Sequence, residues 1–161
     1  MGLLKRTRLG SSKGQSAAEF AFVAPVFFFL LFGILDYGRA FFIQLNLQQA
    51  IQQAARFAST GSHLPNPSNP KLNLTRVQSI IATVQQEAVL VPGVNPQNLQ
   101  ISSVGGGPGS AGGPQDTATI SLTTSLPLMT PMIGKLFPGG NYTFTSSATF
   151  KNEPFDPSQT N

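Results

Sequence analysis

The chain has 161 residues with no cysteine, 16 glycines and 13 prolines, and only 10% of its residues are charged. This length suits one domain, and the lack of cysteine excludes a disulfide framework, a zinc–thiolate site and a thiol nucleophile. The net charge of +4 arises in the N-terminal leader, because the basic residues after position 13 equal the acidic residues in number, and we therefore expect no nucleic-acid partner.

Residues 1–14 form a basic leader. They carry Lys5, Arg6, Arg8 and Lys13, and clusters of this kind stay on the cytoplasmic side of a bilayer. We therefore expect a cytoplasmic N-terminus and an extracytoplasmic C-terminal domain. No small-residue cleavage site follows the apolar run that comes next. The only small-residue junction in a processing-like context is Lys13-Gly14-Gln15.

An uncharged apolar run extends from Phe20 to Leu35. It provides about 16 residues, whereas a bilayer core of about 30 Å needs about 20 helical residues. Flanking apolar residues on both sides supply the difference, so we predict a transmembrane segment over about 18–42. A proline at position 25 should kink this helix. The alternative, a buried core helix of a soluble protein, is disfavoured because the run is too apolar for a small globular core.

The helical pattern continues beyond the membrane, which predicts one long helix over 15–60. Small and apolar residues recur every three or four positions and fall on one face. They are Ala40, Ile43, Leu47, Ala50, Ile51, Ala54 and Ala58. This stripe would let another helix or a sheet approach closely. A Pro/Asn-rich stretch over 61–74 ends the helix and is interpreted as a linker.

The remaining residues predict a small α+β domain over 75–153. Thr75 and Gln78 have the spacing of a capping box and start a second helix. Period-two alternation predicts three strands near 99–104, 118–122 and 142–150, which form a short antiparallel sheet with one buried face. We interpret 105–114 as a flexible glycine-rich loop and 154–161 as a loose tail. The fold class is thus a membrane-anchored α+β protein.

Candidate chemistry gathers at the ends of the apolar run. A carboxylate there is costly unless it is protonated, reaches water or pairs with a cation. If the chain is cut after Gly14, the new amine of Gln15 lies four residues from Glu19 and could pair with it in the same or a neighbouring subunit. Glu19 could equally mark only the headgroup edge, and both readings stay open. Asp36 and Arg39, three residues apart, could form an interfacial ion pair.

No catalytic, metal or cofactor site is indicated. The six acidic residues are scattered, and His63 is interpreted as a solvated loop residue. The glycine-rich run lacks the lysine and hydroxyl residue of a phosphate loop. We therefore expect a protein that is not an enzyme.

Two stretches of the long helix resemble the TadE-like family, pseudopilins of bacterial Tad (Flp, type IVb) pilus systems. The first is Lys13-Gly14-Gln15-Ser16-Ala17-Ala18-Glu19-Phe20, and the second runs from Phe32 through Asp36-Tyr37-Gly38-Arg39 to Phe41. The alanine-rich stretch from Gln52 to Ala58 is similar to the end of the same helix. The resemblance covers about a third of the chain and leaves the outer domain unassigned.

The resemblance implies cleavage after Gly14 by a prepilin peptidase of the inner membrane. Glu19 and Phe20 would then match the glutamate and aromatic pair of this class, in which the glutamate engages the N-terminal amine of a neighbour. The outer region is longer than in short major pilins, which favours a minor subunit that works with other pilins and the assembly platform. It is too short for the larger domain of TadG-type proteins. A signal-anchored surface binding module outside any filament is the alternative.

Overall fold

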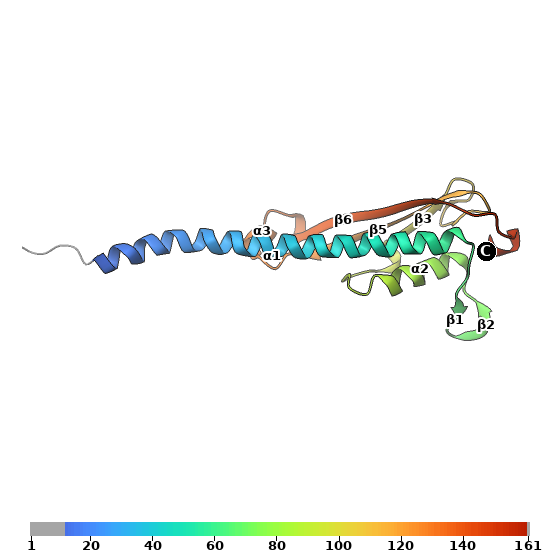
Figure 1. The fold of residues 1–161 in the computed structure, drawn as a ribbon, viewed down its shortest axis with the longest axis horizontal. Coiled ribbons are helices and arrows are strands. Elements are labelled where there is room, and N and C mark those ends of the chain that lie inside the picture. The colour runs from blue at the N-terminus through green and yellow to red at the C-terminus, as the bar shows by residue number, and fades with distance from the viewer. Residues whose placement is uncertain (1–11, 161) are drawn as a thin grey trace, which may run out of the picture.

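A single helix dominates the computed structural model, which describes residues 12–160. Helix α1 (Ser12–Ser59) contains 48 residues, so it is about 72 Å long at 1.5 Å per residue. It continues without interruption through Pro25 and ends at Ser59. The leader predicted for 1–14 lies outside the described residues except for its last three. Figure 1 shows α1 projecting well beyond the rest of the molecule at its N-terminal end.

The outer domain contains two further helices and two antiparallel sheets. Its elements are α2 (Arg76–Glu87), α3 (Pro131–Gly134), β1 (Pro65–Asn66), β2 (Asn69–Asn73), β3 (Leu99–Ser103), β4 (Gly107–Pro108), β5 (Thr117–Pro127) and β6 (Asn141–Lys151), with 3₁₀ turns at Pro96–Asn98, Pro138–Gly140 and Pro157–Thr160. The larger sheet has the order β4-β3-β5-β6, and β1 pairs with β2. The predicted α+β class with a long N-terminal helix is therefore confirmed. The β1–β2 hairpin occupies the stretch that was interpreted as a linker.

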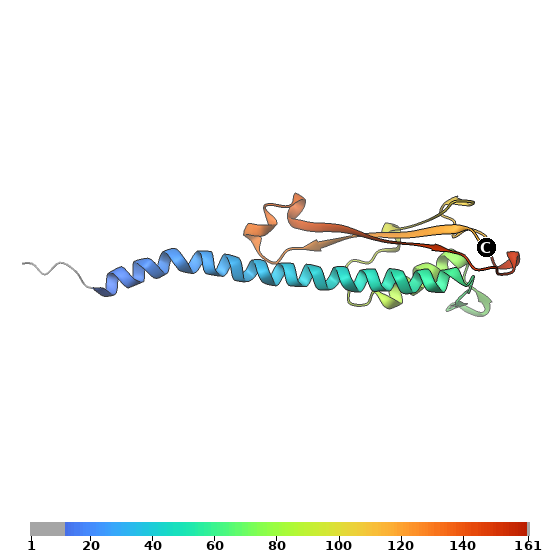
Figure 2. The same ribbon diagram turned by 45° about the horizontal axis from the view of Figure 1, so that its top comes forward.

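The C-terminal half of α1 is part of the core of the outer domain. Strands β5 and β6 lie along it on one side and α2 packs against it on another (Figure 2). All seven residues of the predicted stripe are buried, from Ala40 at 7% exposure to Leu47, Ala54 and Ala58 at 0%. The small alanine side chains permit this close approach of a helix and a sheet. Helix and domain therefore form one continuous body.

The β5–β6 hairpin is the longest element of the sheet. Its register runs from Thr117 opposite Lys151 to Pro127 opposite Asn141, a length of about 36 Å for 11 residues per strand. One face carries buried apolar residues, including Ile120, Leu122, Leu126 and Phe144. The other face is polar and exposed, and threonine hydroxyls pair across it, such as Thr119 with Thr149 at 2.9 Å. The hairpin thus has the one-sided burial that the alternation predicts.

Helix α2 begins at the predicted capping box. The Thr75 hydroxyl accepts a hydrogen bond from the Gln78 backbone N–H at 3.2 Å, and the Gln78 side chain accepts one from the Thr75 backbone N–H at 3.1 Å. Ile80, Val84 and Ala88 are buried against α1, as their spacing predicts. The cap therefore fixes where α2 starts and which face it presents.

A buried polar cluster joins the outer ends of α1, α2 and β6. Arg76, 1% exposed, donates to the backbone oxygens of Ala58 at 2.8 Å and of Gly112, and to Asn152 Oδ1 at 2.6 Å. Asn152 in turn donates to the carbonyls of Ala111 and Gly113 at 2.9 and 2.7 Å. Burial lowers the pKa of the Arg76 guanidinium, and the negative charge of Asp116 opposes this shift.

This cluster changes the interpretation of two segments. The glycine-rich stretch over 105–114 differs from the flexible loop that composition indicates, because it contains β4 and its carbonyls bind Arg76 and Asn152. The start of the expected loose tail is also packed, since the Phe155 ring lies 4.7 Å from the Arg76 guanidinium carbon.

Candidate functional site

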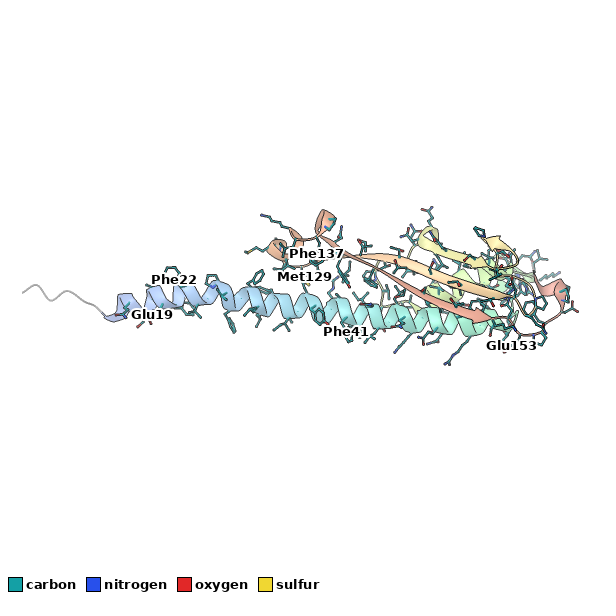
Figure 3. The ribbon with its side chains drawn as sticks, turned by 90° about the horizontal axis from the view of Figure 1, so that it is seen from above. Glu19, Phe22, Phe41, Met129, Phe137 and Glu153 are labelled. Atoms are coloured by element: carbon teal, nitrogen blue, oxygen red, sulfur yellow. The ribbon has the colours of Figure 1, made fainter. Side chains whose placement is uncertain are left out.

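The N-terminal half of α1 has an exposed apolar surface. Within it, large side chains such as Phe20, Phe22 and Ile34 are 69%, 80% and 72% exposed. The most apolar 18-residue window of α1 has none of its residues buried, and the helix is long and apolar enough to cross a membrane. Figure 3 shows side chains, Phe22 among them, radiating from the part of α1 that extends past the outer domain. Such a surface needs a lipid or protein partner.

Glu19 lies near the start of this surface, and Gln15 lies one helical turn before it. The Gln15 Nε2 donates a hydrogen bond to Glu19 Oε1 at 3.1 Å. Both side chains are exposed, as is Phe20. The helix therefore places the Gln15 and Glu19 side chains one turn apart and in contact. The contact is made by the Gln15 side chain and not by its main-chain nitrogen, so the pairing of a Gln15 amine with Glu19 stays a prediction.

Gly14 lies in the first turn of α1. A Cβ atom added there would meet nothing within 4 Å. It also adopts helical geometry, so the described fold has no need of a glycine at this position. A requirement for glycine at 14 would have to come from outside the folded chain, such as from an enzyme that binds this stretch.

Asp36 binds the connection between β5 and β6, and Arg39 binds the last residue of β5. Asp36 is 4% exposed, and its two carboxylate oxygens accept hydrogen bonds from the backbone N–H groups of Met129 and Thr130, each at 2.9 Å. The Arg39 Nη1 donates to the Pro127 carbonyl oxygen at 3.1 Å. The sequence predicted an ion pair between Asp36 and Arg39, and that ion pair stays a prediction. Their long-range partners were missed because they lie about ninety positions away.

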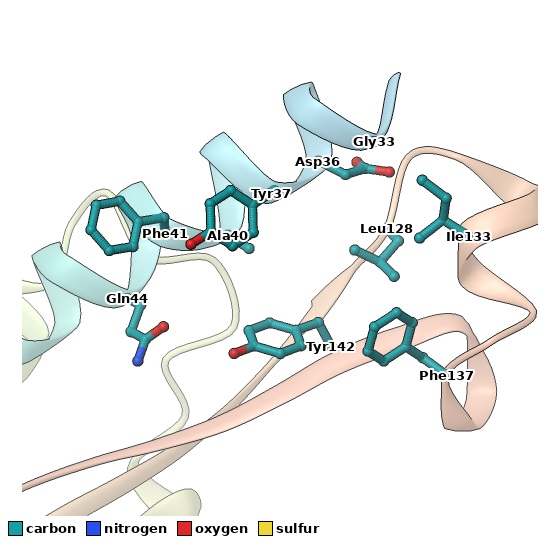
Figure 4. A pocket seen from close by; sticks show the side chains of 10 residues that line it. All are labelled: Gly33, Asp36, Tyr37, Ala40, Phe41, Gln44, Leu128, Ile133, Phe137 and Tyr142. Atoms are coloured by element: carbon teal, nitrogen blue, oxygen red, sulfur yellow. The ribbon is translucent and has the colours of Figure 1, made fainter. Parts of the chain in front are cut away.

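An apolar groove of about 440 Å³ separates α1 from the same connection (Figure 4). Its lining comes from Gly33, Asp36, Tyr37, Ala40, Phe41, Gln44, Leu128, Ile133, Phe137 and Tyr142. The sequence predicted no helix or strand over residues 128–140, because their apolar residues do not recur at a helical or a strand spacing. The available signal was six large apolar side chains in a short proline- and glycine-containing connection.

The described residues offer no obvious catalytic or metal chemistry. Across residues 12–160, no group of three or more His, Asp or Glu side chains is placed to hold a metal ion. His63 is half-buried in the loop after α1, with Nδ1 at 2.8 Å from the Leu74 carbonyl oxygen. The distinctive feature is therefore α1 itself, with its acidic residues and its exposed apolar half.

Comparison with known families concerns this same helix. Residues 14–56 match the family model described as TadE-like protein. The α1 segment is TadE-like. The match confirms the resemblance over residues 14–56, and it ends within α1, before α2 and the strands. No match was found among curated proteins or among solved structures.

The TadE-like match associates this protein with Tad pilus systems. The family consists of structural pilus components and not of enzymes. Together with the exposed apolar half of α1, it indicates a membrane-anchored protein.

Proposed function

We propose that this protein is a minor pseudopilin that takes part in assembly or initiation of a Tad/Flp-type, type IVb adhesive pilus. The observation that carries the proposal is the TadE-like helix, half of which is exposed and apolar while the other half is the core of a folded domain. A subunit of this shape can be held in the inner membrane by its helix and later pass that helix into a bundle of other pilin helices. Its N-terminus would be cytoplasmic and its domain extracytoplasmic.

The proposal includes cleavage between Gly14 and Gln15 by a prepilin peptidase. Cleavage would put a charged amine on residue 15, whose side chain already lies 3.1 Å from Glu19. An ion pair between this amine and Glu19, within one subunit or between neighbours, would neutralise both charges where apolar helices pack together. This pairing would give a physical reason for the Glu19 carboxylate at the N-terminal end of an apolar helix.

The exposed apolar half of α1 supports a transfer between two apolar environments. Each large side chain gains about 1.5–3 kcal/mol when it leaves water. The helix is therefore stable in lipid or in a helical bundle and unstable in solution. Other pilin or pseudopilin subunits and the assembly platform are the partners that such a transfer requires.

Mass spectrometry of the native N-terminus tests this proposal in piliated cells. We expect a mature protein that begins at Gln15, and we expect the full-length chain to accumulate in the Gly14→Arg variant or without the peptidase. An intact Met1 terminus in cells with active peptidase would contradict the proposal and favour the signal-anchored binding module.

A second experiment examines Glu19. We expect the Glu19→Ala variant to insert into the membrane normally but to fail in pilus incorporation. Glu87→Ala, which changes an exposed carboxylate on α2, is the matched control and should assemble normally. Normal piliation in the Glu19→Ala variant would refute the pairing of Glu19 with the amine.

A further inference from the structure

The connection between β5 and β6 exposes large apolar side chains at the end of an otherwise polar hairpin. We call residues 128–137 the tip loop. Met129, Met132 and Leu136 in it are 75%, 67% and 75% exposed, and Phe137 is 37% exposed. Solvent-facing threonine and serine dominate the neighbouring strands. Such a concentration of exposed apolar groups marks an interaction surface.

The tip loop is fixed at one level along α1. Its backbone N–H groups at Met129 and Thr130 bind the Asp36 carboxylate. Ile133 Cδ1 lies 3.3 Å from the position that a Cβ atom on Gly33 would occupy. Figure 3 shows Met129 and Phe137 beside the part of α1 where the outer domain begins. The level of the tip loop in a membrane is therefore set by residues 33–36 of α1.

If α1 spans a bilayer, that level would lie close to its outer boundary. A hydrocarbon core of about 30 Å takes about 20 helical residues. If Glu19 lies at the cytoplasmic interface, the count from Phe20 reaches the outer interface near Arg39. Gly33 and Asp36 then lie within about 10 Å of that interface on its lipid side. The exposed side chains of the tip loop would consequently meet the upper acyl chains.

We propose that the tip loop is a second membrane contact, which inserts Met129, Met132 and Leu136 into the outer leaflet of the membrane that α1 spans. Lys135, also exposed in this loop, is suited to anionic lipid headgroups because lysine extends its charge toward the interface. Lipid is the favoured occupant over a second copy, since the spanning helix holds the loop at this depth before any subunit is met. The groove beside Gly33 opens at the same depth.

This proposal depends on α1 crossing the membrane and not on a pilus role. It changes the expected behaviour of the outer domain. A domain attached only through α1 would tilt freely with the helix. Because α1 and the domain form one body, a second contact on one side would restrict α1 to the tilts that keep the tip loop against the lipid.

The test uses the full chain in nanodiscs that contain anionic lipid, with one copy of the protein in each disc. Because the chain has no cysteine, a Met132→Cys variant accepts one environment-sensitive fluorophore. We expect its emission to shift to shorter wavelength and to be quenched by lipids that carry a quencher near the top of the acyl chain. Val104→Cys is the matched control, since Val104 is an apolar residue that is 84% exposed at the other end of the sheet.

The control probe should emit as in water and should not be quenched. Water-like, unquenched emission from the probe at residue 132 would overturn the proposal by placing the tip loop in water. A shift at residue 132 that arises only with two or more copies per disc would also overturn it and would assign the loop to subunit contact. Neither result depends on cleavage after Gly14, so the proposed pseudopilin role would be judged separately.

Discussion

Loss of the Arg76 guanidinium should destabilise the whole outer domain. The side chain is 1% exposed and donates to Ala58, Gly112 and Asn152, which belong to three different segments. In an Arg76→Ala variant the buried oxygens of Gly112 and Asn152 lose this donor, and each buried group left without a partner costs about 1–3 kcal/mol. Relief of the buried charge offsets part of this cost. We expect a net loss of about 3–5 kcal/mol in the free energy of unfolding.

Urea unfolding of the full chain in detergent micelles would measure this loss. Near-ultraviolet circular dichroism of Tyr142 is a suitable signal, because its ring lies 5.6 Å from that of Phe144. Tyr142 lies at the far end of the β5–β6 hairpin from the Arg76 cluster, so it reports unfolding of the whole domain. At about 2 kcal/mol per molar urea, the midpoint should fall by about 2 M.

Two further variants separate charge from geometry. Arg76→Lys keeps the charge but cannot reach three acceptors with one planar fork, so we expect an intermediate loss. Arg56→Ala removes an exposed arginine from the last turn of α1 and should change stability by less than about 0.5 kcal/mol. A midpoint for Arg76→Ala within error of the Arg56→Ala midpoint would refute the account of Arg76 as the link between the three segments.

Three other predictions use pairs or signals available in the same chain. Leu47→Ala, at a fully buried position, should lower the free energy of unfolding by about 2–5 kcal/mol, measured by urea unfolding. Leu45→Ala, at a residue 42% exposed on the same helix, should lower it far less. Similar losses for the two variants would contradict the burial of this face of α1. Gly112→Ala and Gly109→Ala both place alanine at positive φ, at a cost of about 1–2 kcal/mol. Only at Gly112 would the new Cβ collide with the Asp116 side chain. Thermal unfolding should therefore show a lower midpoint for Gly112→Ala than for Gly109→Ala, and equal midpoints would refute the collision. Asp36→Ala should speed hydrogen exchange of the two tip-loop amides that it binds by about tenfold or more, and unchanged exchange would show that the carboxylate does not hold the loop.

Sequence periodicity predicted the parts of the fold that repeat locally. The apolar stripe from Ala40 to Ala58 follows the helical period, and the alternation over 142–150 follows the strand period. Both place their apolar residues toward the core, as predicted. The capping box at Thr75 needs only neighbouring residues, and it is present. The TadE-like segment was likewise recognisable because its motif residues lie within one helix.

Long-range polar contacts were not predictable in this way. Arg76 occupies the first turn of a helix, where a charged residue normally faces solvent, and its acceptors lie 18 to 76 positions away. Asp36 has the spacing of a local pair with Arg39, but the backbone that it binds is 93 positions further on. No local pattern carries such information, so the tip loop and its attachment to α1 required the structure.

The first and the last long elements of the chain share one core, and this affects how the protein matures during export. α1 is synthesised before β6, which covers it in part, because residues 141–151 follow α1, α2, α3 and the other strands in the chain. In the proposed topology, the buried stripe of α1 stays partly uncovered until nearly all of the chain has crossed the membrane. Chains that stall or are truncated before β6 would keep that helix surface open to proteases. In that topology the core of the outer domain would be completed only after β6 has crossed the membrane.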